Sequence, residues 1–147
     1  MSYNLVYLGA NLLALIGWIV LFLSVLTSSK LRWIADRAIP IMLALVYCVI
    51  IFPNLSFEGG GFSSLDSLSR LFAQSEIALA GWLHYLAIDL FFGGWLVSTS
   101  QQEQLPLQFT LTALLLTALF APVGLVFFFV VRALYRNRKT EQVNLVP

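Results

Sequence analysis

The stretch GWLHYLAIDLFFGGWL, residues 81–96, decides the fold class of this chain. It is almost wholly apolar, yet it carries His84 and Asp89 in its middle. Because about 20 helical residues cross a hydrocarbon core about 30 Å thick, the stretch predicts a membrane-spanning helix. Ionisable side chains inside such helices face the bundle interior or a cavity, so the two residues also predict a site within the membrane.

The composition extends this interpretation to the whole chain. Of its 147 residues, 60% are hydrophobic and 10% are charged, whereas charged residues make up about 25% of a soluble domain. The net charge of +1 offers no basic face for a nucleic acid. The only cysteine, Cys48, cannot form an internal disulfide. The first apolar run has neither a basic flank before it nor a small-residue cleavage site after it, so we expect a retained helix and not a signal peptide.

Four apolar runs are long enough to span a membrane. They cover Leu5–Ser28, Ile34–Phe52, Ile77–Ser98 and Leu107–Leu134. Continuous apolar runs predict helices, since the strands of a membrane barrel alternate polar and apolar residues. The sequence therefore predicts one all-α domain over residues 1–147, a multi-pass bundle of four transmembrane helices whose short connections join antiparallel neighbours.

The long connection between the second and third runs predicts a short amphipathic helix over residues 63–72. One helical face would hold its large apolar side chains, Leu65, Leu68, Leu71 and Phe72. Ser63 followed three residues later by Asp66 resembles a capping box. We expect this helix to lie at the membrane interface, either as a simple connector or as a lid over a site beneath it.

An even number of spans would place both termini and the long connection on one side of the membrane. The basic residues on that side would be Arg70, Arg132, Arg136, Arg138 and Lys139, and those on the other side Lys30, Arg32 and Arg37. The totals favour termini on the cytoplasmic or equivalent side, although the first helix, followed by basic residues, favours the reverse. We expect the termini to face inward.

Asp89 is the most informative residue, because a charged residue at the centre of a spanning helix costs about 2.5–3.5 kcal/mol on insertion scales. Helical spacing places Trp82, Tyr85, Asp89 and Gly93 on one face, which should point into the bundle. Two roles stay open for the carboxyl group. It is either a neutral, proton-donating acid or a hydrogen-bonding group that fixes helix packing.

His84 lies five positions before Asp89, about 140° around the helix, so the two should face different neighbours. A lone histidine in a span either hydrogen-bonds to another helix or acts as a base. As the only histidine, it excludes a bis-histidine haem and a histidine cluster, so we expect no metal and no haem within one chain.

Depth along the helices predicts a polar layer. Counted from the side of the termini, Asn11, Tyr47 and His84 lie at similar levels. Pro122 should kink the fourth helix and free the carbonyl group of Ala118 as an acceptor for Asp89. We expect a pocket that opens beneath the amphipathic segment and ends at Asp89. Its binding residues would be Trp82, Tyr85, Asn11, Tyr47 and Pro122.

Two segments, AGWLHYLAIDLFFGGWLV and FAPVGLVFFFVVRALYR, resemble the neoxanthin-synthase-like family of plastids and bacteria, also called abscisic-acid-deficient-four-like. The segments GGGFSSLDSLSRLFA and ANLLALIGWIVLFLSV are similar to it as well, so the resemblance covers nearly the whole chain. One position departs from the pattern. Gly93, Gly94 and Trp95 stand where the resemblance implies glycine, arginine and tryptophan, and a possible partner for an acid is lost.

The resemblance implies a role in carotenoid chemistry, since plant members are tied to the isomerisation of violaxanthin to neoxanthin. With similar chemistry, Asp89 would protonate the epoxide oxygen and His84 would remove the polyene proton. It also implies a location in a bacterial inner, thylakoid or plastid membrane. The alternative is a non-catalytic subunit, alone or as a homo-oligomer, that docks onto a larger photosynthetic or other membrane complex with or without bound pigment. A proton-relay or transport role is a third interpretation.

Overall fold

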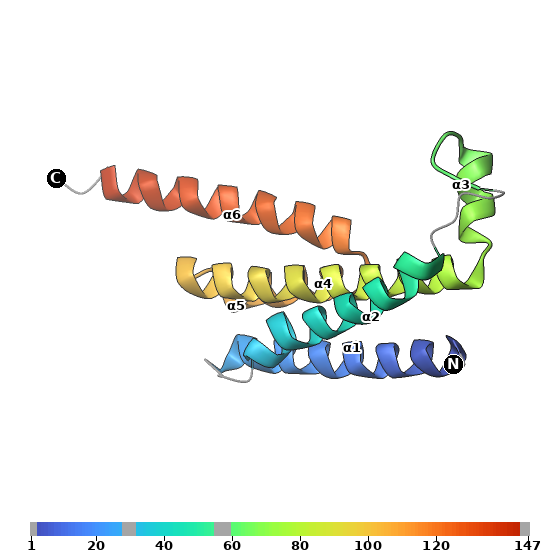
Figure 1. Ribbon diagram of the computed structural model, residues 1–147. Helices are drawn as coiled ribbons and strands as arrows, with labels where there is room; N and C mark the ends of the chain where they lie inside the picture. Colours follow the sequence, from blue (N-terminus) through green and yellow to red (C-terminus); the bar gives the residue numbers. More distant parts are fainter. Residues whose placement is uncertain (1–2, 28–31, 55–59, 145–147) are drawn as a thin grey trace.

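The computed structural model of the chain describes residues 3–27, 32–54 and 60–144, with side chains described as far as residue 137. Within these ranges the regular structure is helical and contains no strand. Six α-helices and one π-helical turn follow each other along the chain. They are α1 (Tyr3–Leu26), η1 (Ile34–Ala38), α2 (Ile39–Asn54), α3 (Leu65–Phe72), α4 (Ser75–Glu103), α5 (Leu107–Leu119) and α6 (Ala121–Asn144) (Figure 1).

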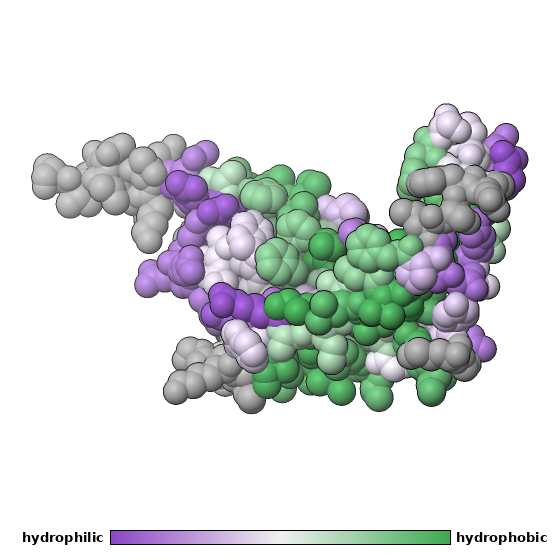
Figure 2. Space-filling view, in the orientation of Figure 1, coloured by the Kyte–Doolittle hydropathy of each residue, from purple (hydrophilic) through white to green (hydrophobic). Residues whose placement is uncertain are grey.

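Three of the predicted spans are present as helices long and apolar enough to cross a membrane. They are α1, the continuous helix from η1 through α2, and α4. The face drawn in Figure 2 supports the same conclusion, because apolar residues cover most of its middle and hydrophilic residues gather towards its two ends. The chain is therefore a multi-pass membrane protein.

The helix α4 lies at the centre of the bundle and packs against α1, α2, η1 and α5. Small residues allow this close packing. At Gly17 of α1 an added Cβ would lie 2.9 Å from the Leu90 side chain, and at Gly93 of α4 it would lie 2.9 Å from Trp18. The buried stripe of α1 consists of Ala10, Ala14, Gly17, Leu21 and Ser24.

The predicted fourth span is wrong as a single helix. α5 ends at Leu119, and Phe120 is extended, with φ −148° and ψ 81°. α6 begins at Ala121 and carries Pro122 in its first turn, where a missing N–H group leaves no helical hydrogen bond unmade. Proline therefore begins a new helix here and does not kink an existing one.

The helices α5 and α6 form a tight hairpin. An added Cβ at Gly124 would lie 2.2 Å from Oγ1 and 2.3 Å from the backbone nitrogen of Thr117, so only glycine permits this approach. α6 then runs back along α4. Its Phe128 ring packs edge-on against Trp95 at 5.5 Å, and the Arg132 guanidinium pairs with both carboxylate oxygens of Glu103.

The hairpin changes the topology. The 13 residues of α5 extend about 20 Å, too short for a hydrocarbon core of about 30 Å. α6 returns to the end of the bundle where α4 finishes, so the start of α1 and the end of α6 lie at opposite ends (Figure 1). The expectation that both termini lie on one side does not hold for this arrangement.

A labelling experiment checks this topology. In a Cys48→Ser background, a cysteine introduced at Asn4 and one introduced at Asn137 should react with a membrane-impermeant thiol reagent from opposite sides of sealed vesicles. Both side chains are exposed. Ser64→Cys is the control and should label with the Asn4 variant, because α3 lies at the end where α1 starts (Figure 1). Labelling of both test positions from one side would contradict the hairpin.

The amphipathic helix is confirmed as α3, but its cap lies one residue later than predicted. Ser64 is extended, and its hydroxyl oxygen accepts a hydrogen bond of 3.2 Å from the amide of Ser67. Leu71 is buried, whereas Leu65 and Phe72 are exposed on the protein. The Phe72 ring lies against Gly81, where an added Cβ would come within 2.9 Å of it. α3 stands apart from α6 and leaves a hollow between them (Figure 2).

Candidate functional site

A cavity of about 410 Å³ lies between α4 and the α5–α6 hairpin. This volume falls within the range of about 300–1,000 Å³ that is usual for small-ligand sites. The wall is mainly apolar. Its polar side chains are His84, Tyr85, Asp89 and Thr117, and the remaining lining residues are Gly81, Ile88, Phe92, Trp95, Leu96, Ala121, Pro122 and Leu125.

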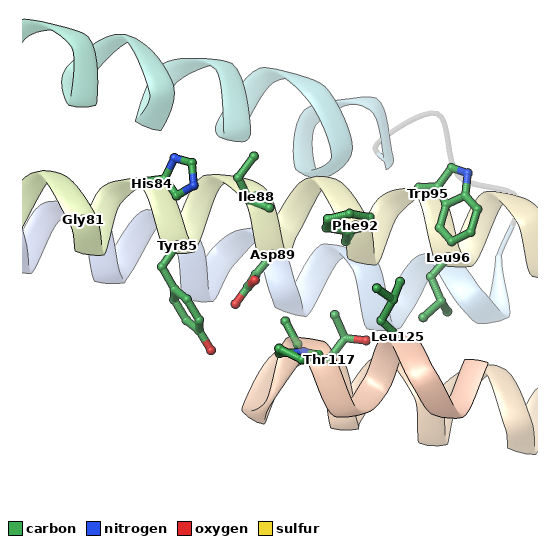
Figure 3. Close-up of a pocket in the computed structure, with 12 residues that line it drawn as sticks. Gly81, His84, Tyr85, Ile88, Asp89, Phe92, Trp95, Leu96, Thr117 and Leu125 are labelled. Atoms are coloured by element: carbon green, nitrogen blue, oxygen red, sulfur yellow. The ribbon is translucent and has the colours of Figure 1, made fainter. Parts of the chain in front are cut away.

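Asp89 lies in the middle of this wall. Its side chain is 6% exposed, which confirms the predicted interior position, and it points from α4 towards the hairpin and Thr117 (Figure 3). The Thr117 hydroxyl donates to the Ala113 carbonyl at 2.8 Å. Tyr85, one turn before Asp89 on α4, lines the same cavity wall (Figure 3). Asp89 is the only carboxyl group among the residues that line the cavity.

His84 lines the same cavity but extends in another direction. Its imidazole lies beside the Tyr47 ring of α2, with 5.7 Å between ring centres and 53° between ring planes. In Figure 3 it points towards α2, whereas Asp89 points towards the hairpin. The structure thus agrees with the prediction that the two residues face different neighbours. A ligand in the cavity would reach each of them from a different side.

The predicted polar layer is divided by α4. Asn11 does not line the cavity; its side-chain oxygen accepts a hydrogen bond of 3.2 Å from the indole nitrogen of Trp82 on the α1 side. Tyr47 lies on the α2 side, against His84. The expected single pocket is therefore wrong for Asn11, Tyr47 and Trp82, because a count of depth gives the level of a residue and not its direction around the helix.

The structure brings together the other predicted site residues. His84, Tyr85, Asp89 and Pro122 all line the one cavity. Their chemical roles stay predictions. No three His, Cys, Asp or Glu side chains gather into a possible metal site in the described part of the chain.

Several lining residues were not predicted, and they fall into two classes. Ile88, Phe92 and Leu96 follow from helical periodicity, since they lie three, seven and eleven residues after Tyr85 and so share its face. Leu125 and Ala121 had no such signal, because they reach the cavity only through the reversal of the chain at Phe120.

Gly94, the position that departs from the family pattern, faces away from the cavity. An added Cβ there would lie 2.1 Å from the Cβ and 3.0 Å from the Cα of Asp36 in η1. Asp36 lies 3.7 Å from Arg32, and its Oδ1 is buried with no hydrogen-bond partner among the described residues. The acid beside position 94 is therefore Asp36 and not Asp89, so the departure leaves the cavity wall unchanged.

This packing predicts a cost for any side chain at position 94. Gly94→Ala should lower the free energy of unfolding by about 2 kcal/mol, since overpacking a close contact costs about 1–3 kcal/mol. The change is measured by unfolding the purified protein in mixed micelles that contain an increasing fraction of a denaturing detergent. Gly94→Ala combined with Asp36→Gly should recover most of the loss, because the clashing Cβ is removed. Equal losses in the single and double variants would contradict the contact.

Comparison with protein families gives a match over most of the chain. The sequence model of a family described as ABA DEFICIENT 4-like matches residues 5–128. The match extends from α1 through the tip of the hairpin into α6 and includes every residue that lines the cavity. Comparison with curated proteins and with solved structures gives no match.

Proposed function

The chain belongs to the ABA DEFICIENT 4-like family, and from that premise we propose that its cavity binds the cyclic end group of a carotenoid-like polyene and isomerises an epoxide there. The single observation that carries the proposal is a buried carboxyl group, Asp89, in an otherwise apolar cavity of a membrane protein. Such a cavity selects an apolar ligand and presents one acidic group to it.

The size and position of the cavity support an end group as the part that enters. A volume of about 410 Å³ suits one ring with its substituents, and a long polyene would have to continue outside it. Lining residues extend from Gly81 to Leu96, about 22 Å along α4. Trp95 and Leu125 lie at one end of this length, and Gly81 and His84 lie at the other, beside α3. The polyene would leave on the α3 side, where the surface is hollowed (Figure 2).

The proposed step conserves atoms and electrons. Asp89, in its neutral form, donates its proton to the epoxide oxygen, and the carbon–oxygen bond breaks to leave a hydroxyl group. His84 removes a proton from the adjacent polyene carbon, and the electrons of that carbon–hydrogen bond form the second double bond of an allene. The product is an isomer of the substrate. Return of one proton from His84 to Asp89 completes the cycle.

Expression in a bacterium whose membranes contain an epoxy-carotenoid tests this function. Pigments extracted from the membranes and from the purified protein should contain an allenic isomer of unchanged mass. Leu125→Trp should fill the cavity and remove both bound pigment and product. Leu115→Trp, on the exposed side of α5, is the matched control and should change neither.

The non-catalytic alternative gives a different result in the same experiment. An accessory subunit would purify with pigment or with a membrane complex, and the pigment would be chemically unchanged. Retention of product in the Leu125→Trp protein, or absence of product from the wild type with pigment still bound, would overturn the isomerase proposal.

Charge supports an orientation that differs from the one expected for four spans. Among the described side chains, Arg32, Arg37, Arg132 and Arg136 lie at the end of the bundle where α4 finishes, and Arg70 lies at the other. Since basic residues accumulate on the cytoplasmic side, we infer that the end of α6 faces the cytoplasm or its equivalent and that α1 begins on the opposite side. In right-side-out vesicles the Asn4→Cys variant should label and the Asn137→Cys variant should not.

A further inference from the structure

A chain of side-chain contacts leads from α1 to Asp89, although no residue of α1 lines the cavity. It runs from Asn11 to Trp82 and on to Tyr85, which lies one turn before Asp89 on the cavity wall. We propose that Trp82 is a positioning residue, which holds Tyr85 so that its hydroxyl group orients the Asp89 carboxyl in the cavity. The inference rests on the proposed function only in treating Asp89 as the reacting acid.

The first contact anchors the indole ring. The Asn11 side-chain nitrogen donates to the Tyr7 carbonyl one turn earlier, at 2.7 Å, which fixes the amide on α1. The amide oxygen then accepts the hydrogen bond of 3.2 Å from Trp82. The Tyr7 ring also lies 6.1 Å from the indole, so α1 contacts Trp82 through one hydrogen bond and one aromatic ring.

The second contact carries this constraint to the cavity. Trp82 and Tyr85 are three residues apart on α4 and stack with ring centres 5.5 Å apart and planes within 19°. Tyr85 is 38% exposed, so the surrounding packing alone leaves its ring room to turn. The stacked indole restricts that freedom and keeps the phenol directed into the cavity beside Asp89 (Figure 3).

The third contact concerns the acid itself. A carboxyl group has two oxygens, and in the proposed arrangement the one that the Tyr85 hydroxyl orients leaves the other for the proton that is transferred. Thr117 faces Asp89 across the cavity, but its hydroxyl hydrogen is committed to Ala113. Tyr85 is thus the lining side chain with a hydroxyl hydrogen placed to orient this carboxyl.

Infrared spectroscopy of the full-length protein in lipid nanodiscs measures this orientation without any substrate. At a pH low enough to protonate the carboxyl, Asp89→Asn identifies the C=O stretching band of Asp89. Tyr85→Phe should move the band to higher wavenumber by removing a hydrogen bond to the oxygen. Trp82→Leu should produce at least half of that shift. Trp33→Leu, which removes another exposed tryptophan, should leave the band unchanged.

A band that stays in place in Trp82→Leu while it moves in Tyr85→Phe would overturn the proposal, and so would a band that does not respond to Tyr85→Phe. If Trp82→Leu does not accumulate in the membrane, Trp82→Phe and Asn11→Leu test the same contact. Both remove the hydrogen bond between α1 and α4, so each should move the band in the same direction as Tyr85→Phe, and a band that stays in place in both variants would contradict the chain of contacts.

Turnover separates this inference from the proposed function. With an active wild type, Trp82→Leu should lower kcat by about tenfold to a hundredfold with little change in KM, because a misplaced acid slows the chemical step. An inactive wild type with the expected band shifts would reject the isomerase and keep the positioning role. An active wild type without band shifts would keep the isomerase and reject the positioning role.

Discussion

Gly124→Ala should lower the free energy of unfolding by about 3 kcal/mol, the upper part of the range for overpacking. The added Cβ would lie 2.3 Å from the backbone nitrogen and 2.6 Å from the Cα of Thr117. A backbone atom cannot turn aside as the end of a flexible side chain can, so α5 and α6 would have to separate.

The sign of this effect distinguishes the hairpin from a continuous fourth span. In the interior of a single helix, replacing glycine by alanine stabilises by about 0.5–1 kcal/mol. Unfolding of the purified protein in mixed micelles measures both cases. Gly9→Ala is the matched control, because an added Cβ there meets no atom within 4 Å and should give that stabilisation. A stabilising effect at both glycines would exclude the tight packing of α5 on α6.

Asp89→Asn should reduce formation of the allenic isomer by about 10²- to 10⁴-fold, the usual contribution of a general acid or base. Asparagine keeps the shape and the hydrogen-bonding capacity of the side chain but cannot donate a carboxylic proton. Pigment analysis of membranes that contain equal amounts of the two proteins measures the loss. Bound pigment and membrane accumulation should be unchanged.

Asp66→Asn on α3, which is exposed, is the control for removal of an acidic group and should retain activity. Activity that survives in Asp89→Asn would exclude Asp89 as the acid. Loss of membrane accumulation in Asp89→Asn, together with normal accumulation of Asp89→Leu, would show that the interior role of the residue differs from the one proposed.

Hydropathy was sufficient to identify the membrane spans α1, η1–α2 and α4, because about 20 consecutive apolar residues have few stable alternatives in lipid. The burial of Asp89 followed from the cost of exposing a carboxyl group to lipid. The amphipathic pattern also located α3, although its cap shifted to Ser64 because that residue adopts the extended backbone. These features depend only on the sequence of each segment and on whether that segment meets lipid or water.

Apart from Pro122 on α6, the candidate site was predictable only along α4. Periodicity places Tyr85 and Asp89 on one face, and the same pattern extends to Ile88, Phe92 and Leu96. It could not show that Trp82 belongs to the α1 side, where its indole nitrogen meets Asn11. Periodicity gives the direction of a residue around its own helix, but only the tertiary structure shows which neighbouring helix lies in that direction.

The hairpin was decided by tertiary structure. Pro122 after an apolar run is compatible with a kinked span, in which the carbonyl group of Ala118 loses its partner, and with the start of a second helix, in which no helical hydrogen bond is lost. Contacts across the hairpin and with α4 select the second outcome: Gly124 against Thr117, and Arg132 against Glu103. Local preference at the break does not fix the direction of the second helix, so the packing of α6 back along α5 determines where the last helix lies and, with it, the second wall of the cavity.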